Sequence, residues 1–107
     1  MLTIWDRLDQ HWIRFRAANT EEAKNFEFGQ LVSYYEMACS LFRDGVFTTR
    51  ATRTLHEHLH EILPAMQRDV TFRGLFDRLR TDDSTFENIR WFCNQPPPGS
   101  QKKTFGN

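Results

Sequence analysis

The residues whose types and spacing could do chemistry lie in one run, His56-Glu57-His58-Leu59-His60. On a helix, residues four apart share a face, so the imidazoles of His56 and His60 could bind one zinc ion. Glu57 stands where a general base would activate a zinc-bound water. The run therefore suggests a zinc-dependent hydrolase in which His56 and His60 bind the metal and Glu57 is catalytic.

A catalytic zinc needs three protein ligands, and a third one is hard to find in this sequence. The extended form of the motif has a histidine where this chain has Met66 and a glycine where it has Leu63, and a later glutamate ligand would have to be Glu87. We therefore expect no catalytic residue and no cofactor. The alternative is zinc held by His56 and His60, and the simplest interpretation of the histidines is a solvated helix face.

Glu36 interrupts an apolar stretch, 34–39, and a buried carboxylate there needs a partner. Arg43 lies seven residues further on roughly the same helix face, and Arg68 follows a later apolar turn. One interpretation is a pocket with a tuned carboxylate. The other is a structural ion pair between helices, and we predict that Glu36 contacts an arginine of another helix.

The first apolar stripe contains Trp5 and Trp12, seven residues apart, whereas Ile4 and Ile13 lie off that stripe. Core packing is the simplest role for the two tryptophans, with a dimer seam as the alternative. A membrane surface is not favoured, because acids and bases are mixed on the polar side. Trp5, Trp12, Ile4 and Ile13 are therefore candidate interface residues.

Helical periodicity dominates the rest of the chain. Apolar residues recur at spacings of three and four in five segments, at about 3–17, 21–43, 49–63, 70–80 and from 84 onward. This pattern predicts an all-α fold, a compact bundle of four to six helices with short loops. Residues 1–95 would form a single helical domain and residues 96–107 a Pro-rich flexible tail.

Local signals mark several ends of these helices. Thr3 and Thr20 are predicted N-caps, and Gly45 is the predicted left-handed residue after the second helix. Pro64 should kink or end the third helix. Ser84-Thr85-Phe86-Glu87 has the form of a capping box for the last one.

Composition restricts the function classes. Fourteen basic and fourteen acidic residues cancel, so nucleic acid is not expected as a partner, although Arg43, Arg50 and Arg53 would be its contacts. No apolar run approaches the roughly 20 residues that span a bilayer, so we expect no membrane span and a cytoplasmic location. Cys39 and Cys93 lie in apolar helical patterns and are predicted to be buried free thiols, with a disulfide between them left open.

The stretch Leu31-Val32-Ser33-Tyr34-Tyr35-Glu36-Met37-Ala38, followed by Leu41-Phe42-Arg43-Asp44-Gly45-Val46-Phe47, resembles a group of uncharacterised bacterial helical domains. Arg68 and the aromatic segment 72–79 resemble the rest of their pattern, and the likeness covers about residues 26–92. The resemblance implies an α-helical fold and a Glu–Arg pair, and it implies no catalytic residues. Members often carry an N-terminal membrane segment, which this sequence lacks.

These observations favour a non-enzymatic protein-interaction module, such as a bacterial or phage accessory protein, that binds another protein or itself. The first helix and Pro96–Pro98 are the expected contact elements. The alternative is the zinc-dependent hydrolase built on the 56–60 run.

Overall fold

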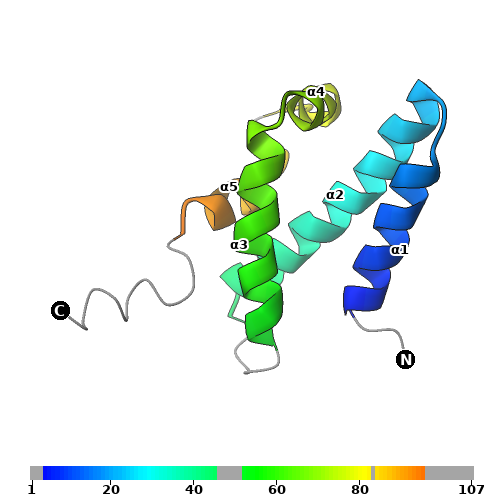
Figure 1. Cartoon of the computed structure of the whole chain (residues 1–107). Helices are drawn as coiled ribbons and strands as arrows, with labels where there is room; N and C mark the ends of the chain where they lie inside the picture. The colour runs from blue at the N-terminus through cyan, green and yellow to red at the C-terminus, as the bar shows by residue number, and fades with distance from the viewer. Residues whose placement is uncertain (1–3, 46–51, 83, 96–107) are drawn as a thin grey trace.

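The computed structural model describes residues 4–45, 52–82 and 84–95, and these form five α-helices and no strand (Figure 1). The predicted all-α bundle of four to six helices is therefore confirmed. Thr3, Arg50, the expected start of the third helix and the tail 96–107 lie outside the described residues. The helices are α1 (Ile4–Ala17), α2 (Glu21–Arg43), α3 (Arg53–Arg68), α4 (Val70–Leu79) and α5 (Glu87–Cys93).

The longest helix, α2, is the element around which the others are arranged. It pairs with α1 in an antiparallel hairpin and also contacts α4 and α5, while α3 packs on α4 and α5 (Figure 1). Its start is fixed by Thr20, whose hydroxyl accepts a hydrogen bond from the backbone N–H of Ala23 at 3.1 Å. It ends at Arg43, and Gly45, just after the C-cap residue Asp44, has φ 75°. Both predicted ends of α2 are therefore confirmed.

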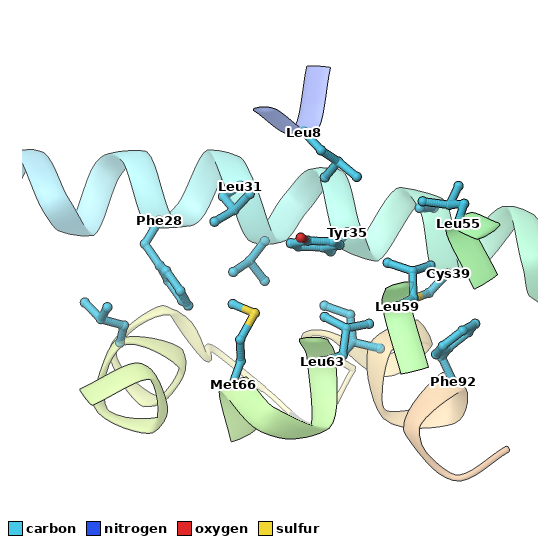
Figure 2. Packing of buried hydrophobic residues seen from close by; sticks show 14 residues of the cluster. Leu8, Phe28, Leu31, Tyr35, Cys39, Leu55, Leu59, Leu63, Met66 and Phe92 are labelled. Atoms are coloured by element: carbon cyan, nitrogen blue, oxygen red, sulfur yellow. The ribbon is translucent and has the colours of Figure 1, made fainter. Parts of the chain in front are cut away.

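The core lies between α2 and the three helices that follow it, with α1 closing it from the other side (Figure 2). Buried side chains of α2 meet a buried stripe on α3, and α1, α4 and α5 add four more buried residues. Cys39 is buried, Cys93 is half-buried, and both are free thiols, as predicted. The fourteen core residues are Leu8, Phe28, Leu31, Val32, Tyr35, Ala38, Cys39, Leu55, Leu59, Leu63, Met66, Leu75, Ile89 and Phe92.

Pro64 neither ends nor divides the third helix, because α3 runs through it to Arg68. Proline removes one helical hydrogen bond and costs roughly 3 kcal/mol in a helix interior. Leu63 and Met66 lie on either side of Pro64, and both are almost completely buried. Burial of these side chains holds the helix together beyond the point where the local signal predicts an end.

The predicted capping box at Ser84 is wrong. α5 begins at Glu87, and its N-cap is Phe86, which has a left-handed backbone with φ 60° and ψ 30°. Ser84 belongs instead to a turn in which Asp82 Oδ1 accepts hydrogen bonds from the Ser84 backbone at 2.9 Å and from its hydroxyl at 2.6 Å. The same oxygen accepts from the Thr85 N–H at 3.1 Å. The Ser84 hydroxyl, which was predicted to cap the helix, is thus hydrogen-bonded to Asp82.

In the described part of the chain, no helix has the length and apolar character needed to cross a membrane.

The packing of the core predicts that two phenylalanines of α2 contribute very differently to the free energy of unfolding. Phe28 is fully buried, and its ring lies 5.2 Å from Phe76, 5.6 Å from Phe15 and 5.7 Å from Phe72 between centroids. We expect Phe28→Ala to lower the free energy of unfolding by about 3–5 kcal/mol in urea titrations. The control Phe26→Ala, at a site 62% exposed, should change it by less than about 0.5 kcal/mol. Equal effects would contradict this packing.

Candidate functional site

The residues of the predicted zinc motif point to two sides of α3. His56 and His60 are half-buried, with ring centroids 4.7 Å apart and planes at 80°. The ring of Phe92 lies 4.3 Å from that of His60 and 5.2 Å from that of His56. Glu57 lies on the solvent side and forms an exposed ion pair with Arg53 at 3.5 Å. The candidate general base is therefore paired with Arg53 on the exposed side of α3.

No group of three or more His, Cys, Asp or Glu side chains that could hold a metal occurs among residues 4–45, 52–82 and 84–95. Nε2 of His60 is buried with no hydrogen-bond partner in this part of the structure. The imidazoles instead pack as aromatic rings, His56 on Phe42 at 5.0 Å and His60 on Phe92. Within the described part of the chain, His56 and His60 therefore have no third metal-binding side chain beside them.

His58 lies on the opposite flank of α3 and joins a hydrogen-bonded chain across three helices. The indole N–H of Trp12 donates to the Tyr35 hydroxyl at 2.9 Å, and that hydroxyl lies 3.2 Å from His58 Nε2. An indole only donates, so the single proton of the hydroxyl remains available to His58, which suits a neutral ring with its proton on Nδ1. Burial raises the pKa of Tyr35 to about 12. The sequence pattern missed this role, because it placed Tyr35 in the core and His58 in solvent.

Glu36 takes its partners from α5 and not from an arginine. Its Oε2 accepts hydrogen bonds from the backbone N–H of Asn88 at 3.0 Å and from the Asn88 amide at 2.8 Å. Its Oε1 accepts from the backbone N–H of Ile89 at 2.9 Å. These N–H groups belong to the first turn of α5, where helical donors have no partner within their own helix. The carboxylate thus caps α5 and complements the positive end of its dipole.

Arg43 is joined to Glu36 indirectly, through Asn88. Its guanidinium donates to Asn88 Oδ1 at 3.3 Å, forms an ion pair with Glu87 at 3.4 Å and lies 5.6 Å from the ring centroid of Trp91. The predicted direct ion pair of Glu36 with Arg43 or Arg68 is therefore replaced by an amide relay. Arg68 is exposed at the end of α3.

The four candidate interface residues of α1 divide between core and surface. Ile4 and Trp12 are half-buried and pack against the core. Trp5 is 37% exposed, with its ring 5.0 Å from that of His58. Ile13 is 58% exposed. Only Ile13 of the four therefore projects freely from the helix.

A larger unpartnered surface lies on α2. Within the segment 26–37, the exposed residues are Phe26, Gln30, Ser33 and Met37, and none of them is charged. We call these four residues the outer face of α2. They follow one another at spacings of four, three and four, which places them on one stripe of the helix. The sequence contained this signal, but the pattern of apolar residues alone does not separate it from the buried stripe.

In comparisons with protein-family models, curated proteins and solved structures, the chain matches none of them.

The capping role of Glu36 leads to a test by Glu36→Gln. This change removes the charge and leaves a single oxygen for three donors, so we expect a loss of about 1–3 kcal/mol in the free energy of unfolding. Amide hydrogen exchange at Asn88 and Ile89 should accelerate most. The matched change Glu22→Gln, at an exposed site on the same helix, should leave both quantities nearly unchanged. Equal losses in the two variants would show that Glu36 does not act as a cap.

Acid should destabilise the fold. Burial is the main cause that lowers the pKa of each of the four histidines, His11, His56, His58 and His60, below the ordinary value of 6.5. Near pH 7.5 the histidines are neutral whether the chain is folded or unfolded. As the pH falls through about 6.5, the histidines of the unfolded chain bind protons more readily than those of the folded chain. The free energy of unfolding therefore declines toward pH 5.

Urea titrations between pH 7.5 and pH 5 would measure this decline. His60→Leu should flatten the profile, because it removes one of the imidazoles whose pKa burial lowers in the folded chain. A free energy of unfolding that stays constant or rises over this interval would contradict the burial of the imidazoles.

Proposed function

We propose that this chain is a non-enzymatic protein-interaction module that pairs with a second copy of itself through the outer face of α2. The observation that carries the proposal is the run of four exposed, uncharged residues along the centre of the longest helix. Phe26 is 62% exposed and Met37 is 44% exposed. Neither side chain belongs to the core of its own chain. Charged residues make up 26% of the sequence, so their absence from this exposed stripe is notable.

The order of residues on this face is self-complementary. Large apolar side chains stand at both ends, and two small or amide side chains, Gln30 and Ser33, stand between them. The spacing of four, three and four is the same in both directions. An antiparallel copy related by two-fold symmetry would therefore place Phe26 on Met37 and Gln30 on Ser33, each contact occurring twice. Thioether–aromatic contact and an amide–hydroxyl hydrogen bond suit these pairs.

A partner of this kind also agrees with the helix geometry. The three spacings average about 3.7 residues, close to the 3.6 residues of one helical turn, so the four side chains stay on one line along α2. One helix on each side is a small contact, so we expect a weak dimer, with a Kd of about 10–100 μM. A second protein that offered a similar helix would compete for the same face.

The supporting case against a hydrolase rests on the geometry of α3. Glu57 forms an ion pair with Arg53 on the solvent side, whereas His56 and His60 pack against aromatic rings. A hydrolase built on these residues would need Glu57 beside the two imidazoles and a third ligand close to them. Among the described residues, no third metal-binding side chain lies close to them.

Charge exchange tests both the face and its antiparallel register. We expect Phe26→Lys and Met37→Glu each to lower dimer affinity at least tenfold in sedimentation velocity, because each buries a charge without a partner. An equimolar mixture of the two variants should regain affinity, since the introduced lysine then faces the introduced glutamate. Parallel pairing would not produce this recovery, because position 26 would face position 26.

The matched control is Ile13→Glu, which adds a charge at a similarly exposed apolar site on α1. It should leave the affinity unchanged. Loss of association in Ile13→Glu but not in Phe26→Lys would move the interface to α1 and refute the proposal. A chain that remains monomeric up to 1 mM would refute it as well.

A further inference from the structure

A small pocket opens where the ends of α3, α4 and α5 meet, away from the outer face of α2. Its volume is about 200 Å³. Three arginines line it, Arg73 and Arg80 from α4 and its C-cap, and Arg90 from α5. Among the described residues of the lining, Asp77 is the single acid. Three arginine side chains in the lining of one small pocket are informative in a protein of zero net charge.

The sequence spacing explains why Arg73 of α4 and its C-cap residue Arg80 line the same pocket. Arg73, Phe76 and Arg80 are three and four residues apart, so they lie on one side of the helix. Arg90 reaches the pocket from α5 and donates a hydrogen bond to the Thr85 carbonyl at 2.6 Å, which fixes its guanidinium. Arg80 and Arg90 make further interactions, so a ligand would share their donors. A guanidinium has five N–H donors and can serve more than one acceptor.

Two aromatic rings form the apolar wall. Phe76 and Phe86 meet edge to face, with centroids 5.4 Å apart. Phe86 is the non-glycine residue with positive φ in the described chain. A left-handed backbone is costly for such a residue and persists where the surroundings hold it. Here the turn at Asp82 precedes it and the Glu36 cap follows it, so the ring of Phe86 is held at the pocket.

We infer that this pocket binds a phosphate monoester carried on an aromatic ring. Guanidinium forks bind phosphate oxygens in pairs, and three forks match the three terminal oxygens of a monoester better than the two of a carboxylate. The rings of Phe76 and Phe86 would contact the aromatic carrier. The pocket is smaller than the 300–1,000 Å³ or so that is usual for whole metabolites. It therefore suits one side-chain-sized group, either a phosphorylated tyrosine or a free aryl phosphate.

Phenyl phosphate is the probe, and the experiment is a two-dimensional amide NMR titration of the whole chain. We expect saturable shifts at Arg73, Phe86 and Arg90, with a Kd of about 0.1–1 mM for so small a contact. Inorganic phosphate and phenol should each bind at least fivefold more weakly, because the first lacks the aromatic ring and the second lacks the phosphate group. Equal binding of inorganic phosphate would indicate a general anion site, and equal binding of phenol an apolar one. Either result would overturn the inference.

Two substitutions at the pocket should act in opposite directions. Arg73→Gln should weaken binding about tenfold, the effect of losing a charge-assisted hydrogen bond. Asp77→Asn should tighten binding about threefold, because it removes the negative charge of the lining. Arg14→Gln makes the same charge change as Arg73→Gln at an exposed site on α1 and should alter the Kd by less than twofold. Both pocket variants keep the core intact, so a change in fold would not produce opposite effects.

A phosphotyrosine peptide distinguishes the two sources of the ligand. Tighter binding of the peptide than of phenyl phosphate supports a phosphorylated protein, and equal binding supports a free aryl phosphate. No shift at the pocket with 20 mM phenyl phosphate would overturn the inference. The same is true if Arg14→Gln weakens binding as much as Arg73→Gln does.

Discussion

The carboxylate of Glu36 connects the longest helix to the shortest one. α5 has seven residues, too few to be stable alone, and its N-cap residue offers no capping side chain. Glu36 binds the backbone N–H groups of Asn88 and Ile89, so the position of α5 is set by α2. Once α5 is fixed, Phe92 packs on the histidines of α3 and Arg90 reaches the pocket at the end of α4. Three distant features of the structure therefore depend on this one interaction.

The parts of the fold that local chemistry decides could be predicted from the sequence. Thr20 caps α2 through its own hydroxyl, and Gly45 ends it because glycine tolerates positive φ. Pro64 and Ser84 misled the prediction for the opposite reason. Pro64 stays within a helix that tertiary burial stabilises, and the hydroxyl of Ser84 is taken by Asp82. When the capping side chain comes from another helix, as at α5, the sequence of the capped helix contains no signal of it.

The spacing of a motif does not say which side of its helix faces the core, and the histidine run shows the consequence. Leu55 and Leu59 point into the core, so positions 56 and 60 lie on one flank of the buried stripe and position 58 lies on the other. Position 57 is then turned away from the core, which is why Glu57 meets solvent and Arg53. The motif singled out His56 and His60 by their spacing alone. Their roles depended on aromatic rings contributed by α2 and α5, which no spacing within α3 could reveal.

The core accounts for most of α2, and the remainder requires a different explanation. Six of its residues are buried, Glu36 caps α5, and Arg43 joins the amide relay. Single exposed apolar residues are normal on protein surfaces and need no explanation. Phe26 and Met37 are not placed singly, however, because they stand at the two ends of a stripe whose spacing is the same in both directions. A monomer gains nothing from that symmetry, whereas a two-fold pair of helices uses every position in it.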